Sequence, residues 1–233
     1  MRAILFDNFE VDIDERSVAL GGSWQGEPRD GKPTAWDGEL LRFFYDKMRT
    51  GVRYLDIGAN TGSYCLLCAL VPDAACIAFE PQRIVREVLQ SNIDRNGLVG
   101  RASISSLALW DINGGTVLAM PQFGASGLAC LSMHPTRFTA ESYITVETRC
   151  LDTLQLSGIN LMKIDVEGAE LMVLRGAEET LRRDHPGLLV EYDERNTAAF
   201  GYDRSEILAF LIRCGYEHFE KLGPDQRDVW VTA

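Results

Sequence analysis

The stretch YLDIGANTG at residues 54–62 joins an apolar run to a turn flanked by two glycines, Gly58 and Gly62. Glycine permits a positive φ at such a turn and lets a ligand approach the backbone closely. The spacing is GxxxG, so the three-glycine dinucleotide fingerprint lacks its last match, and no Gly-Lys-Ser/Thr follows as in a P-loop. The turn therefore favours a ligand with an amino-acid end over a pyrophosphate. Asp56 is placed to accept hydrogen bonds from an ammonium group or to order the turn around one.

Glu80 ends the next apolar run, about 20 residues after the turn. An acidic residue at this distance typically accepts hydrogen bonds from both hydroxyls of a ribose. The turn and Glu80 together predict a ligand that carries adenosine. They do not by themselves separate methyl transfer from hydride transfer.

Strand and helix patterns alternate from residue 53 onward. This alternation predicts a mostly parallel sheet with helices on both faces. Ligands of such sheets bind beyond the carboxyl ends of the strands, so residues 56–62, 80, 107–109 and 165–168 should converge on one rim. We expect strands at 53–57, 75–80, 102–109, 160–165 and 187–192, helices at 62–71, 83–96, 169–183 and 205–214, and a closing strand pair at 216–220 and 228–232.

Two segments depart from the alternation. Residues 111–148 carry short β segments around an irregular loop at 124–135, which predicts a small β insertion after the third strand. Residues 1–50 are weakly patterned and rich in glycine, with one or two short strands, a loop and a helix from about residue 37. We therefore expect an N-terminal extension at 1–50 that packs on a catalytic domain at 51–233.

Composition argues against several classes of partner. Acidic residues outnumber basic ones by 34 to 23, for a formal charge of −11, so the surface repels phosphate backbones and anionic lipid. No window reaches the roughly 18 apolar residues of a membrane span, and the acidic start does not look like a signal peptide. We expect a cytoplasmic protein that binds neither nucleic acid nor membrane; its oligomeric state cannot be read from the sequence.

The six cysteines include a CxxC pair, Cys65 and Cys68, inside the apolar run 64–71. No second pair and no nearby histidine completes a zinc set. Free cysteine is among the most buried residue types, so we expect buried, reduced thiols.

Several blocks of the chain resemble the FkbM-type family of S-adenosylmethionine-dependent methyltransferases. They cover about residues 53–191, and the KIDVEGAE block makes the narrower family name specific. The resemblance implies a Rossmann-like, doubly wound α/β sheet of seven strands, mostly parallel with an antiparallel last strand. It also implies O-methylation of a small-molecule, sugar or natural-product hydroxyl. The blocks are DIGANTGSY at 56–64, FEP at 79–81, CLDTL at 150–154, KIDVEGAE at 163–170, VLRGA at 173–177 and the strand at 186–191.

The resemblance also assigns roles to single residues. It places Asp165 near the methyl-donating sulfonium of S-adenosylmethionine, Glu80 with Pro81 around the ribose, and Ala108 with Leu109 beside the adenine. The residues around the methionine part are Asp56, Gly58, Asn60 and Gly62.

Methyl transfer to a hydroxyl also needs a positioned base. Asp165, Glu167 and Glu191 are carboxylates expected at the sheet rim, and His134 lies in the irregular loop. Glu167 has a second interpretation as negative charge in the first turn of a helix, Glu191 as a structural strand-end residue and His134 as an ordinary loop histidine. The three carboxylates are also a possible set of oxygen ligands for Mg²⁺ or Ca²⁺, although we expect no metal.

Two other functions stay open at this point: a nicotinamide-dependent oxidoreductase on a similar sheet, and a non-catalytic cofactor-binding protein. The missing third glycine and the lack of a Tyr-x-x-x-Lys pair weigh against the first. The expected partner is a small-molecule or glycan acceptor. Its identity, and O- against N-methylation, lie beyond what the sequence tells.

Overall fold

The computed structural model describes residues 1–131, 138–223 and 225–233. It consists of two compact units. Unit 1 comprises Met1–Ser106 and Gln122–Gly127, and unit 2 comprises Leu107–Pro121 and Leu128–Ala233. Within the described ranges, no helix is both long and apolar enough to cross a membrane.

Unit 1 begins with a four-stranded sheet in the order β2-β1-β4-β3 and a short helix, α1. The sequence predicts only one or two short strands in this region. The second hairpin has little buried surface and carries a proline in each strand, so it lacks the apolar alternation that marks a strand. The bounds are β1 Arg2–Phe6, β2 Phe9–Asp12, α1 Arg16–Leu20, β3 Gly26–Arg29 and β4 Lys32–Thr34.

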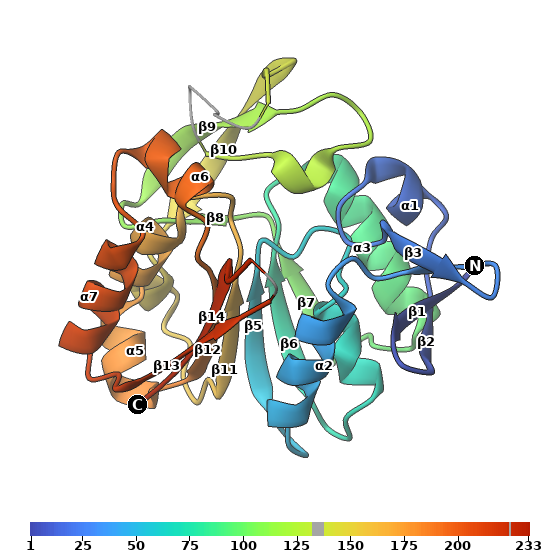
Figure 1. Cartoon of the computed structure of the whole chain (residues 1–233), viewed down its shortest axis with the longest axis horizontal. Coiled ribbons are helices and arrows are strands. Elements are labelled where there is room, and N and C mark those ends of the chain that lie inside the picture. The colour runs from blue at the N-terminus through green and yellow to red at the C-terminus, as the bar shows by residue number, and fades with distance from the viewer. Residues whose placement is uncertain (132–137, 224) are drawn as a thin grey trace. The chain divides into compact units, whose positions relative to one another are not determined.

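Three parallel strands form the centre of unit 1 (Figure 1). Leu55 lies beside Ile77, and Ile77 beside Ser103. The first strand is buried from its second residue onward, as expected of a strand covered on both faces. The elements are α2 Gly38–Lys47, β5 Arg53–Ile57, β6 Ala75–Phe79, α3 Arg83–Arg95 and β7 Ala102–Ser105.

The helix predicted at 62–71 is instead one short 3₁₀ helix, η1 Cys65–Ala69. Its backbone groups bond elsewhere: the Tyr54 hydroxyl donates to the carbonyls of Tyr64 and Cys65, at 2.9 and 3.0 Å. The backbone N–H of Cys65 donates to Asp56 Oδ2, at 3.0 Å. These bonds to strand β5 replace an α-helical turn, and Pro72 follows closely.

All six cysteines are free thiols, and five of them are buried. Burial raises the pKa of the Cys68 thiol to about 12, and the Tyr54 hydroxyl lies 3.3 Å from its sulfur. The expectation that the CxxC pair is a buried structural feature is confirmed.

Unit 2 contributes four further strands: β11 Leu161–Ile164, β12 Gly187–Glu191, β13 His218–Leu222 and β14 Asp228–Thr232. Strands β11 and β12 are parallel, whereas β14 runs antiparallel to both β12 and β13. These four and the three central strands of unit 1 are the strands of one mostly parallel, seven-stranded sheet. The predicted α/β fold with an antiparallel last strand is confirmed.

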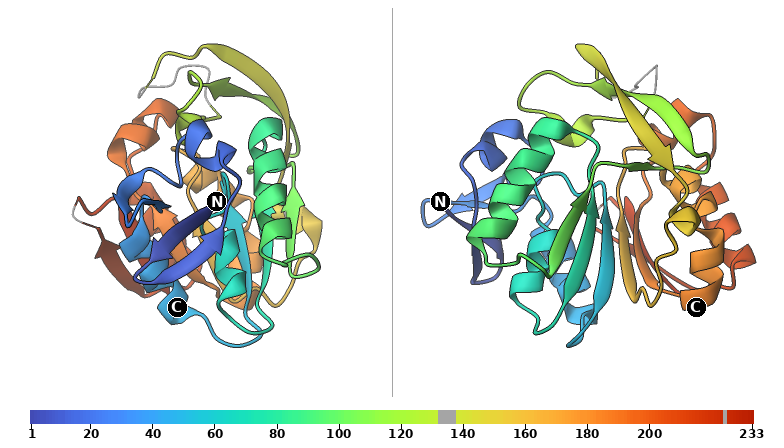
Figure 2. Two further views of the ribbon diagram at one scale, coloured as in Figure 1. Left: turned by 90° about the vertical axis from the view of Figure 1, so that its right-hand side faces the viewer. Right: turned by 180° about the vertical axis from the view of Figure 1, so that it is seen from behind.

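A separate three-stranded sheet in unit 2 is the predicted β insertion, in the order β8-β10-β9 (Figure 2). Its strands are β8 Ala108–Leu109, β9 Gly114–Met120 and β10 Ser142–Arg149. The single strand predicted at 102–109 is therefore wrong. It divides into β7 and β8, and β8 pairs with β10 because the apolar side chains of Ala108, Leu118, Leu131 and Val146 pack in a core of their own.

The helix predicted at 169–183 is also divided, into α4 Glu170–Arg175 and α5 Glu178–Asp184. The chain bends at Gly176, where an added Cβ would lie 2.0 Å from the Trp110 carbonyl oxygen. The Asp152 carboxylate then accepts the backbone N–H groups of Glu179 and Thr180, both at 2.9 Å. Asp152 thus caps α5 from a distant segment, η3 Leu151–Leu154. The remaining helices are α6 Glu194–Thr197, η4 Ala198–Phe200 and α7 Ser205–Arg213.

Candidate functional site

The glycine turn follows β5 in unit 1, and three of its residues adopt left-handed backbone conformations. Gly58 and Gly62 have φ values of +80° and +97°, and Asn60 shares the left-handed region at +48°. A Cβ on Gly62 would lie 2.3 Å from Leu89 Cδ1, in a backbone conformation that other residues adopt only with strain. Both predicted glycines therefore occupy positions that favour glycine.

Asp56 lies near the end of β5, just before this turn, and is 1% exposed. Its Oδ2 accepts the N–H of Cys65, which ties strand β5 to η1. The expected role of Asp56 toward an ammonium group stays a prediction.

Glu80 follows β6 and is also buried, at 3% exposure. Its two carboxylate oxygens accept backbone N–H groups: Oε2 from Asn60 at 2.9 Å, and Oε1 from Gln82 at 2.8 Å. An ionised carboxylate has about four acceptor positions, so each oxygen keeps capacity for one more donor. The two remaining acceptor positions suit the two hydroxyl donors of a ribose. Pro81, which is half-buried, lies between Glu80 and Gln82 in the chain.

Ala108 and Leu109 form β8 of unit 2, where they are 4% and 2% exposed. They pair with Thr148 and Arg149 of β10. Their contact with adenine stays a prediction.

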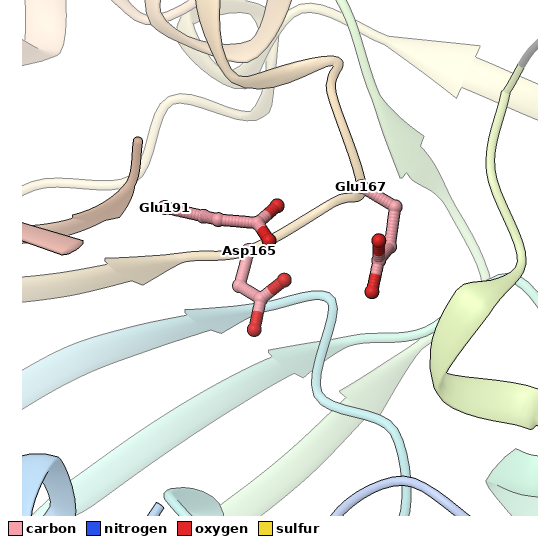
Figure 3. Close-up of side chains that lie close together, drawn as sticks. All are labelled: Asp165, Glu167 and Glu191. Atoms are coloured by element: carbon pink, nitrogen blue, oxygen red, sulfur yellow. The ribbon is translucent and has the colours of Figure 1, made fainter. Parts of the chain in front are cut away.

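Three carboxylates meet in unit 2, where one oxygen of each lies within 4.8 Å of the others (Figure 3). Asp165 directly follows β11, Glu191 ends β12, and Glu167 lies in the turn before α4. The Asp165 side chain is 40% exposed and accepts a hydrogen bond from Lys163 Nζ at 3.0 Å. The structure thus brings together the three carboxylates that the sequence nominates. His134, the fourth candidate base, lies outside the described residues.

Asn196 on α6 is a member of this cluster that the sequence did not reveal. Its Nδ2 donates to Glu167 Oε2 at 3.0 Å and to Glu191 Oε1 at 2.9 Å. Burial, together with the negative charges of Asp165 and Glu167, raises the pKa of Glu191 well above its ordinary value. α6 has four residues and no apolar periodicity, so no sequence signal marked Asn196.

Glu170 plays a structural part next to these carboxylates. It is 1% exposed, and its Oε1 accepts the N–H groups of Val166 and Gly168, at 3.0 and 3.1 Å. Glu167 precedes the helix with a φ of +57°, so it is not the first-turn residue that one sequence interpretation suggested.

The cluster contains oxygen atoms of the kind that Mg²⁺ and Ca²⁺ prefer. However, Asp165 Oδ2, Glu167 Oε2 and Glu191 Oε1 each accept a hydrogen bond from Lys163 or Asn196. Of these donors, the Lys163 ammonium offsets part of the negative charge of the cluster. The expectation that the site holds no metal stays a prediction.

Gly168 lets the Glu167 turn approach α6, and its replacement should destabilise the fold. Its φ is +108°, and an added Cβ would lie 2.5 Å from the Asn196 carbonyl oxygen. We expect Gly168→Ala to lower the free energy of unfolding by roughly 2–4 kcal/mol, measured by urea denaturation. The matched control is Gly201→Ala, at φ +74° with no atom within 4 Å, which should cost about 1 kcal/mol. Equal losses in the two variants would contradict the steric argument.

Comparison with known proteins gives three results. Residues 56–218 match the family described as Methyltransferase FkbM domain. The hexuronic acid methyltransferase AglP of Haloferax volcanii is 26% identical over 156 residues, which are 62% of this chain and 57% of AglP. The chain thus aligns with little more than half of that relative. The crystal structure of a methyltransferase FkbM from Methylobacillus flagellatus KT has a TM-score of 0.57 at 18% identity, covering 79% of this chain and 44% of that one, a likeness of fold alone.

Proposed function

Because the chain belongs to the FkbM methyltransferase domain family, we propose that it transfers a methyl group from S-adenosylmethionine to an oxygen of a small-molecule, sugar or glycan acceptor. The observation that carries the choice of cofactor is Glu80. Its buried carboxylate is held by two backbone N–H groups beside the glycine turn, and it keeps acceptor capacity for a ribose diol.

The proposed cofactor contacts follow from these positions. When bound, S-adenosylmethionine supplies a methyl group made electrophilic by the positive sulfur. The open turn would hold its methionine part, Glu80 and Pro81 its ribose, and Ala108 and Leu109 would border its adenine. The turn residues in this assignment are Asp56, Gly58, Asn60 and Gly62.

Asp165 is the carboxylate we propose next to the reacting groups, where it would accept the proton of the acceptor hydroxyl. A base must reach its substrate, and the Asp165 side chain is 40% exposed. One oxygen of Glu191, by contrast, is buried and has no hydrogen-bond partner among the described residues. Glu167 and Glu191, joined by Asn196, are the second choice, and His134 is a candidate on sequence grounds only.

The acceptor class rests on the name of the relative, a hexuronic acid methyltransferase. A sugar hydroxyl requires a base, whereas a sugar carboxylate is already ionised at neutral pH and does not. A panel of hexuronic acids, their glycosides and the matching neutral hexoses separates these cases. Acceptors are scored by formation of S-adenosylhomocysteine and by the mass of the product.

Calorimetry tests the choice of cofactor. We expect S-adenosylmethionine and S-adenosylhomocysteine to bind with affinities on the order of micromolar, within the ordinary range for enzyme ligands. NADH should give no heat, since the turn lacks the third glycine of a dinucleotide site. Binding of NADH without binding of S-adenosylmethionine would favour the oxidoreductase alternative. Cofactor binding without turnover on any acceptor of the panel would favour a non-catalytic protein.

Cofactor affinity should depend on pH through Glu80. Burial raises the pKa of this carboxyl to about 7, and protonation removes acceptor capacity that the ribose would use. We expect affinity to weaken by about tenfold between about pH 8 and pH 6, and Glu80→Gln to abolish this dependence. A flat affinity profile in the wild-type protein would contradict the assignment of Glu80 to the ribose.

The raised pKa of Glu80 also affects the stability of the fold. Glu80 contributes stability below about pH 4.5, and this contribution is lost as the pH rises through about 7.

A further inference from the structure

Ser126 lies at the centre of a hydrogen-bond network in unit 1 that joins three distant segments. It is 8% exposed, and its hydroxyl donates to the Gly21 carbonyl at 3.0 Å while accepting from Asn60 Nδ2 at 3.3 Å. Its own carbonyl accepts from Gln82 Nε2 at 3.2 Å. One serine of the 122–127 segment thus contacts both the glycine turn and the residues after β6.

Asn60 and Gln82 each bond to Ser126 through their side chains and to Glu80 through their backbone N–H groups. Asn60 N and Gln82 N donate to opposite oxygens of the Glu80 carboxylate. The Asn60 side chain is further restrained because its Oδ1 accepts the N–H of Thr61 at 2.7 Å. Ser126 therefore restrains both donors that orient this carboxylate.

Glycines let the three segments come together at this point. A Cβ on Gly21 would lie 2.0 Å from the Gly124 carbonyl oxygen, and a Cβ on Gly127 would lie 3.0 Å from Gly22 Cα. Gly22 in turn faces the Asn60 side chain, with an added Cβ 3.0 Å from Nδ2. The backbones of these segments are in close contact here, and the Ser126 hydroxyl forms hydrogen bonds to the other two segments at Gly21 and Asn60.

We propose that Ser126 is a positioning residue for the ribose subsite: it fixes Asn60 and Gln82 so that the Glu80 carboxylate faces the hydroxyls of an adenosine-bearing ligand. The proposal rests on the proposed function, because it assumes that Glu80 receives a ribose. It assigns a role in cofactor recognition to the 122–127 segment, which no motif of the sequence indicates. Loss of the hydroxyl leaves Asn60 Nδ2 and the Gly21 carbonyl without this buried partner, which loosens the orientation of both.

Ligand selectivity distinguishes this role from a merely structural one. We expect Ser126→Ala to weaken binding of S-adenosylhomocysteine about tenfold by calorimetry. Binding of the 2′,3′-dideoxy analogue, which offers Glu80 no hydroxyl, should change by less than about twofold. Gln82→Met removes the second link from Ser126 and should show the same selectivity. Ser126→Thr keeps the hydroxyl and should restore much of the affinity.

The control is Ser91→Ala on α3. This half-buried serine accepts a hydrogen bond from Arg95 Nε, and the variant should bind both ligands as the wild type does. Thermal unfolding of each variant establishes that it is folded. Equal losses for the two ligands, or no loss in either Ser126→Ala or Gln82→Met, would overturn the inference and leave the proposed function standing. A wild-type protein that binds neither ligand would overturn both.

Discussion

Glu80→Ala is expected to weaken binding of S-adenosylmethionine by about 100-fold or more. The substitution removes the acceptor for two ribose hydroxyls and leaves the buried N–H groups of Asn60 and Gln82 without their carboxylate. A hydrogen bond to a charged group contributes about 1.5–3 kcal/mol, so the two bonds lost to the ribose hydroxyls correspond to at least this change in affinity.

Isothermal titration of the purified variants measures this effect. Glu80→Gln keeps one carbonyl oxygen but turns an NH₂ group toward a backbone donor, so we expect an intermediate loss of about tenfold. Glu87→Ala is the matched control, because Glu87 lies on the exposed side of α3 in an ion pair with Arg83. If Glu80→Ala binds the cofactor within twofold of the wild type, the ribose assignment is wrong.

Asp165→Asn is expected to reduce turnover by about 10²–10⁴-fold while cofactor affinity stays within a few-fold of the wild type. General base catalysis supplies an enhancement of this size, and an amide cannot accept the proton. The asparagine keeps an oxygen for Lys163 Nζ, so the cluster should hold its shape.

Turnover is measured with the best acceptor of the sugar panel, and affinity by calorimetry on the same preparations. Asp203→Asn serves as the control, since Asp203 is an exposed residue that caps the start of α7 and asparagine caps equally well. Retained turnover in Asp165→Asn would remove Asp165 from the catalytic candidates. Lost affinity would instead assign it to cofactor binding. If the acceptor proves to be a sugar carboxylate, the loss should be much smaller, because no base is needed.

Most of the alternating strands and helices were predictable because they are continuous apolar runs bounded by glycine, proline or charge. β5 lies at the predicted residues, and α3 and α7 differ from their predictions by one residue at the end. The same runs place Asp56 near the end of β5 and Glu80 directly after β6 in unit 1, and Asp165 and Glu191 at the strand ends of unit 2. Strand ends are readable because the apolar pattern stops there and a charged residue begins.

Predictions failed where a backbone group bonds to a partner far away in the chain. The helix at 62–71 became η1 because the Tyr54 hydroxyl and the Asp56 carboxylate occupy its backbone groups. The helix at 169–183 divided because Gly176 packs against the Trp110 carbonyl and Asp152 caps a second start. Local propensity carries no information about such partners.

The glycine turn at 58–62 shows what the sequence by itself indicates. Its residue types and their distance from Glu80 predict a turn after a strand that suits an adenosine-bearing ligand, because glycine adopts a positive φ readily and a carboxylate can accept two hydroxyls. Tertiary structure decided which side chains hold these groups in place. Asn196 joins Glu167, 29 residues away, to Glu191, and Ser126 fixes the two donors to Glu80 across 44 and 66 residues. Periodicity and spacing describe neighbours along the chain, whereas hydrogen bonds of this kind depend on how the chain folds back on itself.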